Sequence, residues 1–317
     1  MKDYKSLQIV FMGTPEFAVA SLDALVKAGC NIVAVITPRD KPAGRGMQMQ
    51  QSAVKKYAVE HNLKVLQPEK LKNPEFLAEL KSLNADLQIV VAFRMLPEAV
   101  WNMPPMGSVN LHGSLLPQYR GAAPINWAVI NGEKETGVTT FKLKHEIDTG
   151  DILLQESFPI GENETAGEVH DRMKEIGARV LVQTVKGLAD GTLKETPQTS
   201  IQQPATRIKH APKIFTETCK IDFTNTVDEV HNLVRGLSPF PGAFTYLDGK
   251  MLKIYKSEKL QLVSGQTGTV RPGSHETDGK TFLKFACANG YIQLKELQLE
   301  GKKKMGIVEF LRGYRFK

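Results

Sequence analysis

The sequence predicts an α/β protein with a mostly parallel, Rossmann-like sheet, followed by a smaller domain rich in β-structure. The first part is predicted from apolar runs of strand length that alternate with segments of helical periodicity. The second part is predicted from a polar, proline-containing segment at 191–212, after which short strand-like runs recur between turns. A chain of 317 residues is long enough for both. We therefore expect domains at 1–190 and 213–317, joined by a linker at 191–212.

The N-terminal strand–helix–strand unit sets the direction of the sheet. Leu7–Met12 and Ile32–Ile36 are apolar runs, and the apolar residues between them recur at helical spacing. Thr14 is the expected N-cap of this helix, with Pro15 in the first turn and Gly29 at the C-terminal end. Such a unit implies a right-handed crossover between parallel strands.

This unit lacks the features of a dinucleotide-binding site. The turn after the first strand has Gly13 alone, where such sites have GxGxxG. The second strand ends in Thr37-Pro38, where an acidic residue would bind the ribose. We therefore reject an NAD-dependent enzyme.

The remaining elements continue the alternation. Further helices are expected at Ser52–His61, Pro74–Leu83, Pro124–Asn131, Thr165–Leu188 and Thr226–Leu237. Further strands are expected at Val65–Leu66, Leu87–Ala92, Met106–His112, Thr136–Leu143, Asp151–Phe158, Phe244–Leu247, Leu252–Tyr255, Gly268–Val270, Thr281–Ala286 and Tyr291–Leu297. Asp248-Gly249 is a hairpin signal. Pro38–Gln51 is a long loop rich in Gly and Pro, and such loops in compact domains are usually functional or mobile.

Charge is distributed unevenly along the chain. Residues 1–208 carry 23 basic and 23 acidic residues, whereas residues 209–317 carry 18 basic and 11 acidic ones, so the whole net charge of +7 lies in the last third. This asymmetry suits a polyanionic partner, but it equally suits a solvated basic surface.

The composition excludes several protein classes. The three cysteines lie far apart and the seven histidines show no metal-ligand spacing, so we expect neither a disulfide framework nor a metal site. The N-terminal apolar run is interrupted by Gln8, which favours a first strand over a signal peptide. No apolar run approaches the length of about 18 residues that spans a membrane. We expect a cytoplasmic protein.

One motif carries the chemistry of the first domain, at residues 107–124 (GSVNLHGSLLPQYRGAAP). Asn110 and His112 are two residues apart on a predicted strand, so they point to one face and Leu111 to the other. The carboxyl ends of parallel strands are where open α/β sheets bind ligands. An isolated Asn-x-His also suits an ordinary polar pair at a strand end. Asp148 follows in DTGDILL, on a tight turn that enters a strand.

Together, Asn-x-His, LLPxYRGxxP and DxGDI resemble the folate-dependent formyltransferases, most closely those that act on methionyl-tRNA. The resemblance covers nearly the whole chain. It implies that Asn110, His112 and Asp148 are the catalytic residues. It also implies a formyltransferase catalytic domain at 1–190 and an OB-like, tRNA-binding β-barrel at 213–317, where RGLSPFPGA and EGKKKMGIVEFLRG match the family.

The resemblance also implies two sets of binding residues. The folate-binding residues would be Phe93, Arg94, Met95, Leu96, Ser114, Leu115, Leu116 and Pro117. The tRNA-binding residues would be Lys41 and Arg45 in the KPAGRG loop, together with Lys209, Lys302, Lys303 and Lys304. The chain departs from the family at Met47-Gln48, where a basic pair is common, and at Arg94, where a smaller residue is common. Whether Arg94 reaches the substrate or is a surface charge is left open.

The implied reaction moves the formyl group of 10-formyltetrahydrofolate to the amino group of methionyl initiator tRNA, for translation initiation. Asn110 and a cationic His112 would stabilise the oxyanion, and Asp148 would orient His112 and help to move the amine proton. Three alternatives are a formyltransferase for a small amine such as an amino sugar nucleotide, a formyltetrahydrofolate hydrolase, and a non-catalytic RNA-binding module. A monomer without a metal is expected.

Overall fold

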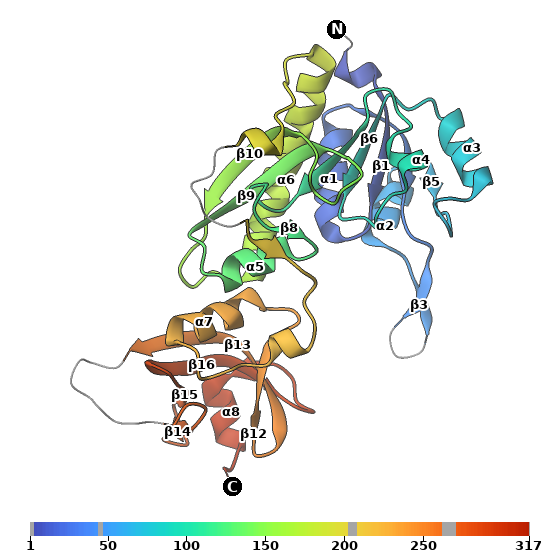
Figure 1. The fold of residues 1–317 in the computed structure, drawn as a ribbon. Helices are drawn as coiled ribbons and strands as arrows, with labels where there is room; N and C mark the ends of the chain where they lie inside the picture. The colour runs from blue at the N-terminus through green and yellow to red at the C-terminus, as the bar shows by residue number, and fades with distance from the viewer. Residues whose placement is uncertain (1–2, 44–46, 202–207, 262–270, 317) are drawn as a thin grey trace. The chain divides into compact units, whose positions relative to one another are not determined.

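The computed structural model describes residues 3–43, 47–201, 208–261 and 271–316. The chain forms two compact units, each made of more than one stretch of sequence. The first contains residues 1–120, 137–158 and 170–209, and the second contains residues 121–136, 159–169 and 210–317. Figure 1 shows the elements of both units. No helix within the described residues is long and apolar enough to cross a membrane.

The first unit is built on a seven-stranded sheet with the order β10-β9-β7-β6-β1-β2-β5 (Figure 1). Its strands are β1 (Gln8–Gly13), β2 (Asn31–Ile36), β5 (Val65–Leu66), β6 (Leu87–Val91), β7 (Ser108–His112), β9 (Glu135–Lys142) and β10 (Ile152–Pro159). The five strands from β5 to β7 are parallel, and β9 runs antiparallel to β7. The mostly parallel sheet predicted from the sequence is confirmed.

Strand order reverses beside β1, since the chain passes from β1 outward to β2 and β5 and then returns to β6 on the other side. The carboxyl ends of β1 and β6 therefore flank a topological switch point, where open α/β sheets bind ligands. Strand β7 lies next to β6 in parallel register, so His112 at its end lies on this same edge of the sheet.

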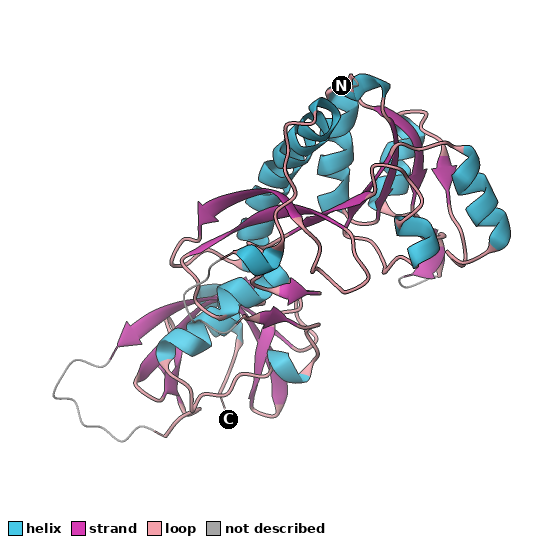
Figure 2. Cartoon of the chain, turned by 45° about the horizontal axis from the view of Figure 1, so that its top comes forward, coloured by secondary structure: helices cyan, strands magenta, loops and turns pink. Residues whose placement is uncertain are grey.

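The helices of the first unit cover both faces of the sheet (Figure 2). They are α1 (Glu16–Lys27), α2 (Ala53–Glu60), α3 (Pro74–Ser82), α4 (Glu98–Trp101) and α6 (Ala166–Asp190), with a short 3₁₀ turn η1 (Tyr4–Ser6). On one face, Phe76 and Leu80 of α3 form a buried cluster with Met12 and Val90. The paired register Met12–Val90–Asn110 places Asn110 on this face. Leu111 faces the other way, where Gly177 of α6 lies against it.

Most predicted elements of the first unit are confirmed to within a few residues, but two details are wrong. Pro15, not Thr14, is the N-cap of α1; it has extended backbone, and the helix begins one residue later. The stretch 38–51 is not entirely loop, because β3 (Lys41–Ala43) pairs with β4 (Gln48–Gln50). Gly29 ends α1 as expected, with φ +78° and the Cys30 N–H donating to the Leu25 carbonyl.

The second unit contains a curled antiparallel sheet with the order β12-β13-β16-β15-β14, and β17 pairs with β16. Its elements are α5 (Pro124–Ile130), η3 (Glu217–Cys219), α7 (Val227–Gly236), β12 (Ala243–Leu247), β13 (Lys250–Gln261), β14 (His275–Thr277), β15 (Leu283–Cys287), β16 (Gly290–Leu299), β17 (Met305–Gly306) and α8 (Ile307–Gly313). The expected small β-domain is confirmed, as half a barrel. The strand expected at Gly268–Val270 lies outside the described residues.

Local sequence signals explain how this sheet begins. Asp248 and Gly249 both have positive φ, at +49° and +78°, as a two-residue hairpin between β12 and β13 requires. Thr226 and Glu229 form a reciprocal capping box at the start of α7. The apolar face of α7, including Val230 and Val234, packs into the buried core of the sheet.

Three further short elements follow from tertiary contacts and have no clear sequence signal. Strand β8 (Arg120–Gly121) pairs with β11 (His210–Ala211), and η2 (Gln198–Ser200) lies within the segment expected to be a linker. The backbone of that segment also forms an antiparallel bridge between Ile152 and Thr196. The segment is therefore joined to β10 at Thr196 by backbone hydrogen bonds.

Phe141 on β9 is expected to be a critical core residue beneath the loop that follows β7. It is fully buried and clusters with Leu116 and Ile152. Replacing Phe141 with alanine is expected to lower the free energy of unfolding by about 3–5 kcal/mol, because the cavity cannot collapse between paired strands. Urea unfolding measures this. Phe240→Ala is the matched control, since Phe240 is 81% exposed; equal stabilities of the two variants would contradict the assignment.

Candidate active site

His112, at the end of β7, is held by contacts from both sides of its ring. The residue is 6% exposed. Its Nε2 lies 2.9 Å from the Tyr119 carbonyl oxygen. A carbonyl can only accept, so Nε2 carries a proton and donates it. Its Nδ1 lies 3.8 Å from Oδ2 of Asp148, within ion-pair range but longer than a hydrogen bond. The Nδ1 edge is therefore the one that faces the Asp148 carboxylate.

Asn110 projects from the same face of β7 two residues earlier. Its side chain is half-buried, and it makes no hydrogen bond to any residue that the structure describes. The amide therefore has donors available for a substrate oxygen. The sequence-based expectation that Asn110 and His112 share a face, with Leu111 opposite, is confirmed.

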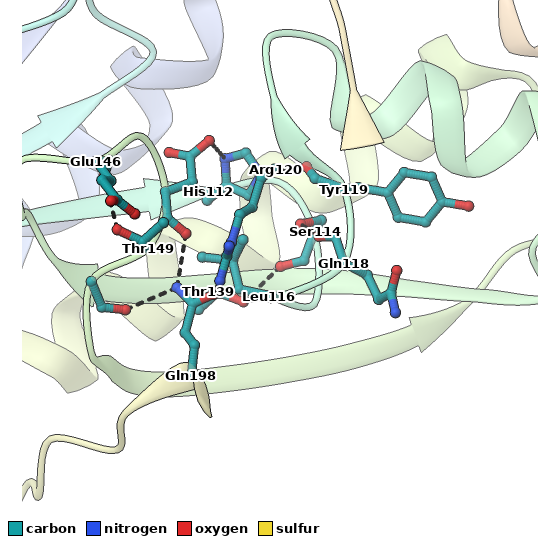
Figure 3. Close-up of polar contacts among 12 residues, drawn as sticks. His112, Ser114, Leu116, Gln118, Tyr119, Arg120, Thr139, Glu146, Thr149 and Gln198 are labelled. Atoms are coloured by element: carbon teal, nitrogen blue, oxygen red, sulfur yellow. Dashed lines mark hydrogen bonds and ion pairs between the residues drawn. The ribbon is translucent and has the colours of Figure 1, made fainter. Parts of the chain in front are cut away.

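The loop after β7 is folded on itself by hydrogen bonds around Thr139 of β9 (Figure 3). The Thr139 hydroxyl donates to the Ser114 carbonyl at 2.6 Å and accepts from the Leu116 N–H at 3.1 Å. The Ser114 hydroxyl donates to the Gln118 carbonyl, and Ser114, Leu116 and Pro117 are buried while Leu115 is half-buried. This folding carries the chain back so that the Tyr119 carbonyl reaches His112.

Asp148 lies on a tight turn in left-handed backbone, with φ +55°. Asp is one of the few residues other than Gly that adopt this conformation readily. In the same turn the Thr149 hydroxyl donates to the Glu146 carbonyl at 3.0 Å. The turn then passes so close to β9 that a Cβ on Gly150 would lie 1.6 Å from the Lys142 carbonyl oxygen.

The sequence analysis missed a glutamine that contacts this turn. Gln198 Nε2 donates to the carbonyls of Asp148 and Gly150, at 2.8 and 2.9 Å, and its Oε1 accepts two hydrogen bonds from Arg120 (Figure 3). No local pattern marks Gln198, because it lies in a polar segment 50 residues after Asp148. Arg120 belongs to the LLPxYRG motif, but the motif does not reveal its partner.

The proposed folate segment follows β6 and turns sharply at Ala92, which has φ +47°. Phe93 and Leu96 pack on the edge of a buried cluster, and Met95 is 74% exposed. Arg94 donates to the Pro68 and Glu69 carbonyls, at 2.9 and 3.2 Å. The guanidinium is thus bound to the neighbouring loop.

The residues expected to bind tRNA fall in several places. Arg45 lies outside the described residues. Lys41 is exposed on β3, and Lys209 is exposed beside the loop after β7, where its carbonyl accepts from the Tyr119 N–H at 2.7 Å. In the second unit Lys302 is exposed, whereas Lys303 pairs with Glu309 at 3.7 Å and Lys304 pairs with Glu296 at 2.8 Å.

Comparison with known proteins supplies the family. The formyl transferase model matches residues 7–185, and the model of the formyl transferase C-terminal domain matches residues 213–315. Methionyl-tRNA formyltransferase of Bacteroides fragilis is 52% identical over 98% of this chain and 96% of that protein. The same enzyme of Parabacteroides distasonis is 53% identical over 98% of this chain and 97% of that protein.

The chain belongs to the methionyl-tRNA formyltransferase family. The resemblance seen in the Asn-x-His, LLPxYRGxxP and DxGDI motifs is confirmed. Among solved structures, the sugar 3N-formyl transferase WlaRD has a TM-score of 0.66 at 22% identity, covering 94% of this chain and 99% of its own. HypX from Aquifex aeolicus, in complex with tetrahydrofolic acid, has a TM-score of 0.63 at 18% identity, covering 98% of this chain and 48% of its own. These two show a shared fold.

The close approach at Gly150 gives a test of the Asp148 turn. Gly150→Ala is expected to lower the rate of formyl transfer at least about 10-fold, because the new Cβ displaces the turn from β9 and small misplacements at a site are costly. Gly313→Ala is the control, since a Cβ there meets nothing within 4 Å. Steady-state kinetics of both variants measure the effect, and full activity of Gly150→Ala would show that the turn need not hold this position.

Proposed function

We propose that the chain transfers the formyl group of 10-formyltetrahydrofolate to the amino group of methionyl initiator tRNA, at a site formed by Asn110, His112 and Asp148. The observation that carries the proposal is identity of about half of all residues with methionyl-tRNA formyltransferases along the full chain, both units included. The three proposed catalytic residues lie on the ligand-binding edge of the sheet or on the turn that faces it.

The segment after β6 fits the pterin ring of the formyl donor. Phe93 and Leu96 offer apolar surface, and Met95 is exposed beside them. The backbone N–H and C=O groups of residues 93–96 make no hydrogen bonds to the described residues. A flat heterocycle that donates and accepts along its edge can use these groups. Arg94 would keep the segment in place, and the loop at Ser114, Leu115, Leu116 and Pro117 would form the other side.

The reaction places a specific demand on each catalytic residue. The amine nitrogen bonds to the formyl carbon, and the carbonyl oxygen of the formyl group becomes an oxyanion. Asn110 would donate to this oxygen, and a cationic His112 would stabilise its charge in a water-poor site. The bond from carbon to the folate nitrogen then breaks. The proton lost by the amine must reach that nitrogen. Asp148 would take part in this transfer, and its carboxylate would stabilise the positive charge of His112.

The tRNA would bind through Lys41, Arg45, Lys209, Lys302, Lys303 and Lys304. With Met47-Gln48 in place of a basic pair, Arg45 supplies more of the charge in the β3–β4 loop. We keep the division into a catalytic domain at 1–190, a linker at 191–212 and a tRNA-binding domain at 213–317 as part of the proposal. We also propose a monomer that acts in the cytoplasm, because one chain supplies every site residue and the relatives are bacterial enzymes named for a tRNA substrate.

The deciding experiment is formyl transfer from 10-formyltetrahydrofolate to methionyl initiator tRNA, beside uncharged tRNA and free methionine. Activity with the charged tRNA alone is expected. Formate release without transfer would identify a hydrolase instead. Turnover of an amino sugar nucleotide, without turnover of methionyl-tRNA, would show that the chain is a formyltransferase for a small amine.

Loss of the oxyanion donor is expected to be costly. Asn110→Ala is expected to lower kcat by about 10²–10³, the usual effect of removing one such donor, while tRNA affinity stays the same. Single-turnover formylation and filter binding of tRNA measure the two quantities. Asn102→Ala is the control, because Asn102 is exposed and precedes β7 at the opposite end of the strand. A near-normal kcat for Asn110→Ala would remove this residue from the mechanism.

Lys302, Lys303 and Lys304 differ in their ion pairs, and these pairs predict how much each lysine contributes to tRNA binding. Lys302→Ala is expected to weaken tRNA binding and to reduce the slope of log affinity against log salt by about 1, as for a lost phosphate contact. Lys304→Ala is expected to change both less, because Lys304 already pairs with Glu296. Binding titrations from low to moderate salt measure this. The reverse ranking would show that the Lys304–Glu296 pair opens when tRNA binds.

A further inference from the structure

Gln198 is a buried side chain whose hydrogen-bonding capacity is fully used. It is 5% exposed. Its two amide hydrogens go to the carbonyls of Asp148 and Gly150, and its oxygen accepts from Nε and Nη2 of Arg120, at 3.1 and 2.5 Å. An amide side chain has two donors and an oxygen that can accept twice, so every position is filled. Gln198 therefore joins Arg120 to two backbone carbonyls of the Asp148 turn, those of Asp148 and Gly150.

These contacts form a closed cycle of residues that includes His112, called here the ring through Gln198. His112 Nε2 donates to the Tyr119 carbonyl, and Tyr119 precedes Arg120. Arg120 donates to Gln198, and Gln198 donates to the backbone of the Asp148 turn. The Asp148 carboxylate then faces His112 Nδ1. Figure 3 shows His112, Arg120 and Gln198 within this group. Both ring nitrogens of His112 therefore face groups that are linked, through Arg120 or through the Asp148 turn, to the same glutamine.

The Asp148 turn needs such support, because it lacks regular structure. Asp148 has left-handed backbone, and no strand ladder or helix fixes the direction of its side chain. The two hydrogen bonds from Gln198 hold the carbonyls on either side of Thr149. They restrict the rotation that would turn the Asp148 carboxylate away from His112. An error of about 1 Å in such a pair is enough to cost much of the rate.

The backbone around Gln198 has its own anchor. Ile152 and Thr196 exchange two backbone hydrogen bonds, at 2.8 and 2.9 Å, next to Gln198 in the chain. Removing the Gln198 side chain therefore leaves the segment attached to β10. The change falls on the Asp148 turn and on Arg120, which makes the effect on catalysis separable from the effect on folding.

We propose that Gln198 is a positioning residue for the reaction: it fixes the Asp148 carboxylate relative to His112 through the carbonyls of Asp148 and Gly150. This inference rests on the function proposed above. It assigns a role in the chemistry to a residue of the segment that the sequence predicts to be a linker. Gln198 itself touches neither substrate nor the reacting atoms.

Two substitutions separate the contacts of Gln198. Gln198→Met keeps the length of the side chain and removes all four hydrogen bonds. Gln198→Glu keeps acceptors for Arg120 but turns an oxygen toward two carbonyl oxygens. Both are expected to lower kcat about 10- to 100-fold, with KM for the formyl donor and for methionyl-tRNA within about twofold of the parent. A role confined to folding would instead lower the yield of active enzyme and leave the kcat of the folded fraction unchanged.

Gln88→Met is the matched control. Gln88 is 1% exposed and accepts from the Ser108 hydroxyl at 3.0 Å, at the start of β6 and β7, away from their carboxyl ends. It is expected to lose stability and to retain kcat. If Gln198→Met and Gln88→Met lose stability and kcat to the same extent, Gln198 is an ordinary buried glutamine and the proposal is wrong.

A double mutant tests whether Gln198 acts through Asp148. In an Asp148→Asn background, Gln198→Met is expected to cause no further loss of kcat. Multiplying losses would show an independent role and would overturn the proposal. Nitrogen-15 NMR of His112, assigned with His112→Gln, gives a readout without turnover, because Gln198→Met is expected to shift the Nδ1 resonance. An unchanged Nδ1 resonance overturns the inference even if formyl transfer is absent, whereas a shifted resonance in an inactive protein contradicts only the proposed function.

Discussion

The hydrogen bond from His112 Nε2 to the Tyr119 carbonyl is the contact on which the rest of the site depends. It directs Nε2 toward the Tyr119 carbonyl, and so leaves the Nδ1 edge of the ring to face Asp148. It also requires the chain to return to β7 within seven residues, and the Thr139 hydroxyl makes that return possible by bonding to Ser114 and Leu116. The buried cluster around Phe141 then supports the loop from below. The position of the His112 ring is therefore set by β7, β9 and the loop together.

The parts of the fold that follow from short-range patterns could be predicted from the sequence. Strands β1, β2 and β6 were predicted from their continuous apolar runs, and the shared face of Asn110 and His112 was predicted from the twofold period of a strand. The hairpin at Asp248-Gly249 was predicted from residues that tolerate positive φ. The N-cap of α1 was not, because Pro15 can occupy either the N-cap or the first turn and local sequence does not decide between them.

Contacts between distant segments could not be predicted. Gln198 gives no local signal, since its partners at Asp148 and Arg120 are brought to it only by the folded sheet. Arg94 looked like a surface charge or a substrate ligand, and its carbonyl partners come from a loop about 25 residues away. The sequence likewise could not show which basic side chains of the last third are free, because Lys259, Lys284, Lys295 and Lys304 all pair with nearby carboxylates. Sequence shows which groups exist, and tertiary structure decides which are already occupied.

The ring through Gln198 has a consequence for how the protein is made. Its residues lie between His112 and Gln198 in the sequence. Gln198, the last to be synthesised, lies beyond residue 185, where the match to the first family model ends. During synthesis, at about 5–20 residues per second, the sheet can assemble before the ring can close. A nascent chain that has formed β10 but has not yet emerged as far as Gln198 has its seven strands and an incomplete site. On the role proposed for Gln198, the site is therefore completed only after all seven strands of the sheet have been synthesised.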